Sequence, residues 1–187
     1  MSDQFAIKEI LMSDIILTRP SQSEYSDYYH RYVQCVPDDN VIPYLAVQLE
    51  AVDALLGHLS DEQADTRYSL DKWTVKEVVG HMSDTERIMS YRMLRIARGD
   101  TTPLASFDQD DYVRAARSRV RTIGELLDEF YAVRASTLAL SRGIDEVAWT
   151  RTGVASNVSV SARALAYIIA GHAAHHLNVL WERYALR

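Results

Sequence analysis

The sequence is poor in the residues that interrupt helices and in the residue that staples small secreted domains. Its 187 residues include seven glycines, four prolines and one cysteine, Cys35. A single cysteine cannot form a disulfide within the chain, so a disulfide scaffold is excluded and a reducing compartment fits the composition. Most of the glycines and prolines lie between periodic segments rather than inside them, which indicates helices joined by modest loops.

Long apolar runs are also missing. No run approaches the roughly 18 consecutive apolar residues that a membrane-spanning helix requires. The first twenty residues carry acidic side chains and lack a basic start followed by an apolar block, so they do not resemble a secretion signal. We therefore expect a cytoplasmic protein without a membrane partner. Whether Met1 or Met12 is the natural start stays open.

Lysine is scarce as well, with three residues, and the net charge is −6. An acidic chain is unsuited to binding nucleic acid by bulk electrostatics, so we expect no nucleic-acid partner. We interpret the arginines of residues 87–121 mainly as a solvated helix face with intramolecular ion pairs to Glu86, Asp108, Asp110 and Asp111. The alternative is a rim that attracts an anionic substrate. These arginines are Arg87, Arg92, Arg95, Arg98, Arg114, Arg117, Arg119 and Arg121.

Four long segments carry apolar residues at alternating spacings of three and four, the pattern of one buried stripe along a helix. Four such stripes must bury against one another, so the sequence predicts an all-α four-helix bundle. We expect this bundle domain over residues 38–187, after an N-terminal extension at residues 1–37. The four stripes are Ile42, Leu45, Leu49, Val52, Leu56 and Leu59; Val78, His81, Thr85 and Ile88; Ile123, Leu126, Phe130, Val133, Thr137 and Leu140; and Leu165, Ile169, His172, His176 and Val179.

Local signals predict where the helices begin and end. The first helix is predicted to start near residues 38–39. Thr74–Glu77 and Thr122–Glu125 have the capping-box pattern, in which a hydroxyl and a carboxylate satisfy free N–H groups at a helix start. The second and third helices are predicted to end near Gly99 and Gly143, because a glycine after an arginine is typical of a helix C-terminus.

Shorter elements are expected outside the four helices. Residues 20–37 contain four tyrosines and are predicted to form a short helix across the bundle, while the chain before them is expected to be mobile. A second short helix is predicted within residues 107–119, in the link between the second and third helices. We interpret residues 143–160 as a long loop whose only strand signal is the run VASNVSV, and Ser159 or Ser161 is the candidate cap of the fourth helix.

Histidine placement is the most informative feature. His172 and His176 are four residues apart, so on a helix they lie about 40° apart around the axis and about 6 Å along it. Imidazoles placed in this way can bind one metal ion together. Both stand where the stripe would otherwise carry Leu or Ile, and burying two unpartnered imidazoles there would cost on the order of 1–3 kcal/mol each. A metal ion removes this cost, although hydrogen-bonded core histidines are an equal alternative for this pair alone.

A third ligand is expected from another helix, and His81 is the best candidate. It lies on the apolar face of the second helix directly after Gly80, as His172 follows Gly171, and glycines allow close packing. Three neutral histidines leave the ion its full charge and at least one position for water or a thiolate. Alone, His81 is more simply interpreted as a hydrogen-bonded core residue.

Asp84 is the candidate catalytic residue. It lies one helical turn after His81, where it could accept a hydrogen bond from a ligand or accept a proton. The alternative is a solvated aspartate. Other metal chemistries are disfavoured, because Ala173 stands where a zinc protease of the HExxH type needs its glutamate, and no Glu-x-x-His pair lies on a core face.

Several segments resemble the DinB-like (YfiT-like) family, and the resemblance extends over roughly residues 38–187. It is carried by residues 73–81, 83–87, 95–100, 107–110 and 171–184. This resemblance implies a four-helix bundle, often dimeric, in which His81, His172 and His176 bind nickel or zinc.

The resemblance also implies candidate activities. Some members of the family are S-transferases that conjugate a low-molecular-weight thiol, such as bacillithiol or mycothiol, to an electrophile. We therefore expect a metal-dependent thiol S-transferase with a thiol and an electrophile as substrates, acting as a homodimer. A metal-dependent hydrolase that uses activated water and a non-enzymatic, stress-associated metal-binding bundle are the alternatives.

Overall fold

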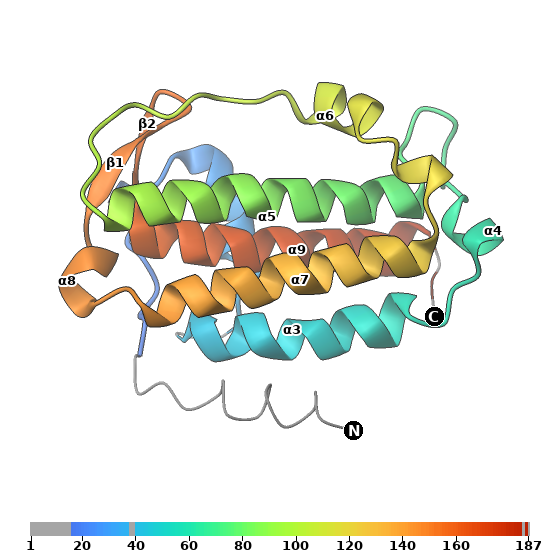
Figure 1. The fold of residues 1–187 in the computed structure, drawn as a ribbon, viewed down its shortest axis with the longest axis horizontal. Helices are drawn as coiled ribbons and strands as arrows, with labels where there is room; N and C mark the ends of the chain where they lie inside the picture. The colour runs from blue at the N-terminus through green and yellow to red at the C-terminus, as the bar shows by residue number, and fades with distance from the viewer. Residues whose placement is uncertain (1–15, 38–39, 185, 187) are drawn as a thin grey trace.

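A computed structural model of the chain describes residues 16–37, 40–184 and 186. Four long helices lie side by side and form the predicted all-α four-helix bundle, which is confirmed (Figure 1). The described part of the chain contains no helix that is both long and apolar enough to cross a membrane. The long helices are α3 (Val41–Leu56), α5 (Val75–Ala97), α7 (Ile123–Arg142) and α9 (Ala162–Arg183).

Some expectations about the N-terminal part lie outside the described residues. These are the start of the first helix at residues 38–39, the mobile chain over residues 1–15, and Met12. Within the described residues, Asn40 is the N-cap of α3. The expectation of a mobile chain does not hold for Leu17, because this side chain is buried and its carbonyl accepts a hydrogen bond from the Tyr167 hydroxyl.

The bundle has two pairs of neighbouring helices that run in the same direction. Figure 1 shows α5 and α7 running from the end of the bundle with α4 (Asp61–Ala64) towards the end with the hairpin of β1 (Thr152–Ala155) and β2 (Val158–Ser161), whereas α3 and α9 run the opposite way. Helix α9 packs against α3 and α5, and α7 packs against the same two helices. Because α5 and α7 are parallel neighbours, the chain between them must return along the whole bundle, and residues 98–122 make this crossing (Figure 1).

Of the short helices, α2 (His30–Val33) and α6 (Gln109–Ala115) lie where the sequence predicts them, whereas α4 and α8 (Glu146–Trp149) are not predicted. The crossing link contains α6, within the predicted residues 107–119, followed by a 3-10 turn at Ser118–Val120. The tyrosine-rich segment forms 3-10 turns at Gln22–Glu24 and Asp27–Tyr29 and then α2, which packs on α9.

The interpretation of residues 143–160 as a loop is wrong in detail. They contain α8 and an antiparallel hairpin of β1 (Thr152–Ala155) and β2 (Val158–Ser161). The hairpin coincides with the VASNVSV run, and its two-residue turn has φ values of 53° and 65°, at Ser156 and Asn157. Positive φ at both turn residues is the type I′ geometry that suits a twisted two-stranded ribbon.

The predicted helix ends are confirmed. Thr74 and Thr122 form complete capping boxes with the carboxylates three residues later. Gly99, just after α5, has a φ of 79°, a conformation that glycine adopts without steric cost, and Gly143 is the C-cap of α7. Of the two candidate caps for the fourth helix, Ser161 is the one that accepts a hydrogen bond from the start of α9.

A buried polar network joins all four long helices. The guanidinium of Arg134 in α7 is fully buried and donates two hydrogen bonds to the carboxylate of Glu86 in α5, at 2.8 and 2.9 Å. It also donates to the side-chain oxygen of Gln48 in α3, at 3.0 Å. The Gln48 amide in turn donates to the carbonyl of Ala170 in α9, at 2.8 Å. The network therefore holds α9 at Ala170, two residues before His172.

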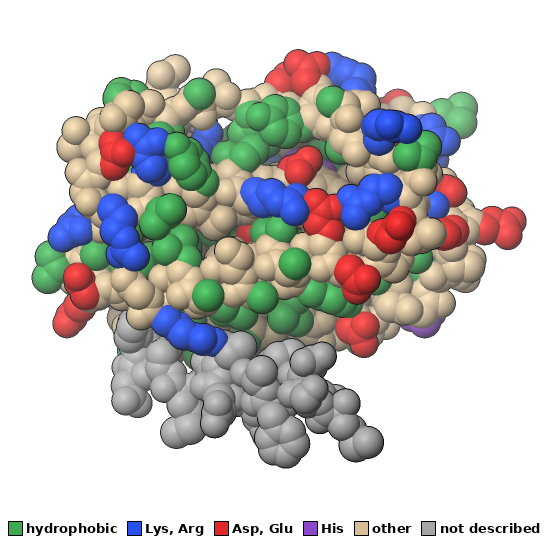
Figure 2. All heavy atoms as spheres, viewed as in Figure 1, with side chains coloured by type: hydrophobic (Ala, Val, Ile, Leu, Met, Phe, Trp, Pro, Cys, Tyr) green, Lys and Arg blue, Asp and Glu red, His purple; other side chains and the backbone are tan. Residues whose placement is uncertain are grey.

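Several arginines of residues 87–121 form ion pairs within the chain, and of the four expected carboxylate partners Asp111 is paired with one of them. Arg87 and Arg121 both bind Glu129, and Arg114 binds Asp111. Figure 2 shows basic and acidic side chains alternating along the middle of this face, over α5 and α7. The prediction that Glu86 pairs with one of the eight arginines is wrong, because this carboxylate binds Arg134, which lies outside that segment.

Candidate metal centre

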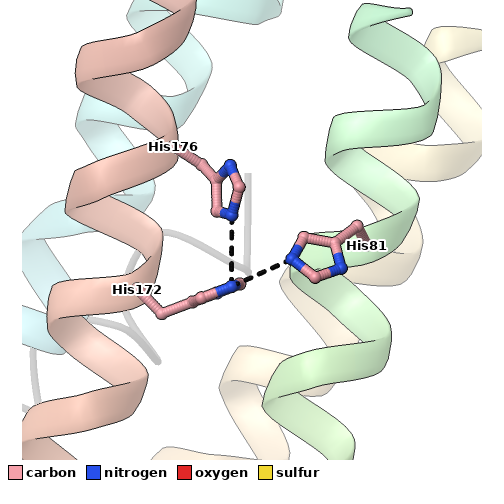
Figure 3. Close-up of side chains that lie close together, drawn as sticks. All are labelled: His81, His172 and His176. Atoms are coloured by element: carbon pink, nitrogen blue, oxygen red, sulfur yellow. Dashed lines mark hydrogen bonds between the residues drawn. The ribbon is translucent and has the colours of Figure 1, made fainter. Parts of the chain in front are cut away.

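Three histidines from two helices meet inside the bundle. His81 comes from α5, and His172 and His176 come from successive turns of α9 (Figure 3). The Nε2 atom of His172 lies 3.0 Å from that of His81 and 3.1 Å from that of His176. The candidate ligand atoms of all three lie within 4.8 Å of one another, so the structure brings together the three residues that the sequence singles out.

The arrangement fits a metal ion better than it fits mutual hydrogen bonds. A ring nitrogen of a neutral imidazole carries either one proton or one lone pair. The Nε2 atom of His172 can therefore complete a good hydrogen bond with only one of its two neighbours. Nitrogens that each bind one ion at about 2.0–2.1 Å lie roughly 3 to 3.4 Å apart. Two of the three nitrogen pairs have this spacing here, and the third pair lies within 4.8 Å.

Burial keeps the three imidazoles in the neutral form that a metal requires. Burial lowers the pKa of His81 from 6.5 to about 4. Burial also lowers the pKa of His172 well below 6.5, and repulsion from the neighbouring His176 and His81 adds to this effect. The pKa of His176 is held well below 6.5 by the same two causes, burial first. Lone pairs are therefore available at neutral pH.

Neighbouring side chains fix the ring positions. The Thr85 hydroxyl lies 3.4 Å from Nδ1 of His81, so this ring nitrogen has a partner while Nε2 faces the other histidines. The Trp73 ring packs against the His81 ring with a centroid distance of 4.8 Å. The Tyr32 ring meets the edge of His172 at 5.3 Å and that of His175 at 5.4 Å.

Two glycines permit the close packing around these histidines, as the sequence predicts. A Cβ atom at Gly171 would overlap the backbone carbonyl of Tyr32, so only glycine lets α2 lie directly on α9 at this turn. A Cβ atom at Gly80 would overlap the hydroxyl of Ser118, which follows α6 in the crossing link. Each glycine precedes a histidine and allows a neighbouring segment to cover it.

Two clefts reach the histidine cluster. The larger one, here called the tyrosine cleft, has a volume of about 480 Å³ and is bordered by His81 and His172. The smaller one, here called the tryptophan cleft, has a volume of about 370 Å³ and is bordered by His176. Gln109 and Asp110, in the first turn of α6, border both clefts.

Asp84 lies apart from the histidine cluster. Its carboxylate is 3.5 Å from the guanidinium of Arg87. Asp84 is not among the described residues that border the two clefts. Burial raises the pKa of Asp84, and the charge of Arg87 opposes this rise. Thr85, rather than Asp84, is the hydrogen-bond partner of His81. A proton-accepting role for Asp84 stays a prediction.

Sequence reasoning missed several residues that shape the centre. Tyr32 belongs to the tyrosine-rich segment, but its contact with His172 spans 140 positions and has no local signature. Trp73 directly precedes the cap of the helix that carries His81, a position that could have marked it as a neighbour. Gln109 and Asp110 belong to a segment of family resemblance and reach the centre only because the crossing link folds back over α5.

Comparisons with known proteins agree with this description. A family model described as the DinB superfamily matches residues 44–180. None of the curated proteins matches the chain. The solved structure of YfiT from Bacillus subtilis, described as a probable metal-dependent hydrolase with an unusual four-helix bundle topology, superposes with a TM-score of 0.66. The two share 17% sequence identity, and the match covers 90% of this chain and 94% of that one.

Proposed function

This chain belongs to the DinB superfamily, and we propose that it is a metal-dependent thiol S-transferase whose nickel or zinc ion is held by His81, His172 and His176. The observation that carries the proposal is the approach of three neutral imidazoles, two buried and one partly buried, to one another. In the described part of the chain this ligand cluster contains no carboxylate, so its ligands do not neutralise a bound cation.

A divalent ion with three neutral ligands keeps its charge and, when bound, lowers the pKa of a thiol or water that reaches it. Other side chains of the protein hold and cover the histidine rings. Thr85 holds the ring of His81, and Trp73 and Tyr32 cover the rings of His81 and His172 and limit the access of water.

The proposed reaction joins sulfur to an electrophilic carbon. The thiol loses its proton to solvent, and its sulfur forms a new C–S bond. At an alkyl halide the halide leaves with the bonding electron pair. At an epoxide the C–O bond breaks, and the oxygen takes up a proton.

A hydrolase is the second candidate, because the similar structure of YfiT carries that description. In that case water takes the place of the thiol, and the two clefts border a single substrate. A non-enzymatic, stress-associated metal-binding bundle is the third candidate. It predicts metal binding without turnover of any substrate.

The metal site is tested by elemental analysis of the purified protein. We expect one nickel or zinc ion per chain in the wild type and a loss of at least about 90% in His172→Ala and His176→Ala, since each substitution removes one of three ligands. His58→Ala is the matched control, because His58 is exposed at the end of α3. Unchanged metal content in both ligand variants would remove the proposal.

The reaction is tested by turnover of a generic electrophile with a panel of low-molecular-weight thiols. We expect a rate that disappears with a chelator and returns when nickel or zinc is added back. Chelator-sensitive hydrolysis without thiol would favour the hydrolase, and metal binding without either activity would favour the binding bundle.

We also propose a homodimer, on the basis of family resemblance. Light scattering after size exclusion should then give about twice the chain mass of 21.2 kDa. A monomer mass at micromolar concentration would contradict this.

A further inference from the structure

We propose that the centre is built for two reactants, which enter through separate clefts on either side of the first turn of α6. This inference rests on the proposed transferase and specifies how its two substrates are placed. The inference starts from the fact that the three histidines border different clefts. The tyrosine cleft reaches His81 and His172, whereas the tryptophan cleft reaches His176.

The first turn of α6 is held in place between the clefts. Its N-cap, Asp108, accepts hydrogen bonds from the backbone N–H groups of Asp110 and Asp111, at 2.9 and 3.0 Å. The preceding Phe107 ring contacts Tyr112 at 5.2 Å and lies over the buried guanidinium of Arg92 at 5.8 Å. Gln109 and Asp110 therefore lie between the two clefts, and the contacts of Asp108 and Phe107 hold them in place.

The tyrosine cleft is lined by groups that suit a hydroxyl-rich reactant without negative charge. Its walls carry hydroxyl groups, aromatic rings and the carboxylates of Asp108 and Asp110, and its lining contains no lysine or arginine. The nearest guanidinium groups are already engaged. Arg31 donates to the Tyr32 hydroxyl, and Arg92 donates to Ser156. The hydroxyl-bearing residues of this lining are Ser26, Tyr28, Tyr29, Tyr32, Thr85, Ser106 and Ser156.

The tryptophan cleft is lined by aromatic rings and by Val78 and Val179, with Asp71, Lys72, Gln109 and Asp110 also in its lining. Tyr68 and Tyr184 meet edge to face at 5.0 Å, and the Tyr184 hydroxyl donates a hydrogen bond to the Trp73 carbonyl at 2.6 Å. Aromatic rings bury large apolar surfaces and favour other rings as partners. This cleft suits a flat, apolar electrophile, and the tyrosine cleft suits the thiol.

Simultaneous occupancy is tested by NMR on the zinc-loaded protein, with 1-thioglucose as a neutral hydroxyl-rich thiol and 2-naphthol as an unreactive aromatic probe. We expect 2-naphthol to shift the indole signal of Trp73, assigned through Trp73→Phe. The shift should persist, with an affinity changed less than twofold, when 1-thioglucose is saturating. Displacement of one probe by the other, or no binding of 2-naphthol, would overturn the inference.

Charge selection is tested with a pair of substitutions in the same turn. Mercaptosuccinate, an anionic thiol, should bind the wild type at least about tenfold more weakly than 1-thioglucose. Asp110→Asn should remove most of this difference in affinity, because it removes a carboxylate that borders the cleft. Asp111→Asn is the control, because Asp111 faces Arg114 and lies outside both linings. Equal binding of both thiols, or equal effects of both substitutions, would contradict the assignment of the tyrosine cleft.

These binding measurements separate the inference from the proposed function. Two-site binding without turnover would remove the transferase but keep the two clefts. Turnover with mutually exclusive binding of the two probes would keep the enzyme and remove the separate clefts.

Discussion

An imidazole can bind a metal ion only while one of its ring nitrogens is unprotonated. At this centre burial favours that state before any ion arrives, because it lowers the pKa of His81 to about 4. The rings are also held in place, since Thr85 and Trp73 contact His81. The ligand set is thus neutral and oriented in advance, which reduces the cost of organising it around an ion.

Thr85→Val should weaken metal binding while leaving the fold intact. Valine has the shape of threonine but cannot hold Nδ1 of His81, which lies 3.4 Å from the hydroxyl. Loss of such an outer hydrogen bond typically costs about 10–100-fold in metal affinity, and we expect a loss at the lower end. Competition with a chromophoric chelator measures the affinity. Thr85→Ser keeps the hydroxyl and should restore most of it.

The metal-free protein should lose stability as the solution becomes acidic. The unfolded chain takes up a proton on His81 as the pH falls below 6.5, whereas the folded chain does so only near a pKa of about 4. The free energy of unfolding should therefore be constant with respect to this group above pH 6.5 and should fall between pH 6.5 and 4, by about 3 kcal/mol. His172 and His176 act in the same direction.

Urea unfolding at pH 7.5 and pH 5, with a chelator present, measures this difference. His81→Gln should flatten the pH dependence, and His58→Ala should not change it. Equal stability of the wild type at both pH values would show that the histidines titrate normally.

At the scale of the elements, the centre depends on how closely α2 approaches α9. The carbonyl of Tyr32 occupies the space where a side chain at residue 171 would lie. This contact places the Tyr32 ring against His172, one residue further along α9. A glycine in the middle of a helix lowers its intrinsic stability, so its presence here is explained by packing rather than by helix propensity.

Gly171→Ala should destabilise the protein by about 1–3 kcal/mol, since the clash is with backbone and cannot be relieved by a rotamer change. It should also displace Tyr32 from His172. Gly124→Ala is the control, because the added Cβ would meet only Thr122 at 4.0 Å, and the change should be neutral or slightly stabilising. Thermal unfolding of the two variants measures the effect. A neutral Gly171→Ala would mean that α2 does not pack on α9 as described.

The sequence predicts the elements well and their assembly poorly. Stripes, capping boxes and helix-ending glycines are local patterns, so α5, α7 and their ends can be predicted from short windows. The histidine pair on α9 can be predicted for the same reason. The neighbours of the cluster depend on which segments fold back over it, and Tyr32 and Asp110 carry no periodic signal. Arg134 occupies a core position, which its residue type does not predict.

At the scale of the whole molecule, the four long helices share one buried polar network. Arg134 binds Glu86 and Gln48 with no exposure to solvent, and Gln48 holds the carbonyl of Ala170. A buried ion pair is weak evidence of net stabilisation, but removing one partner leaves the other charge buried without compensation.

Arg134→Leu should therefore destabilise the protein by about 3–5 kcal/mol. The double variant Arg134→Leu/Glu86→Leu should be more stable than Arg134→Leu alone, because it removes the stranded carboxylate. Arg87→Leu serves as a control for an exposed pair and should cost less than about 1 kcal/mol. Denaturant unfolding of the three variants tests this, and a double variant no more stable than Arg134→Leu alone would contradict the coupling.

The separation of the ligands along the chain has a consequence for how the protein is made. His81 leaves the ribosome 91 residues before His172, an interval of roughly 5 to 18 s at ordinary rates of translation. During that time the growing chain holds only one of the three nitrogens and has no means of retaining an ion tightly. Uptake of the proposed ion would therefore follow the synthesis of α9, so its identity would depend on the ions available after translation.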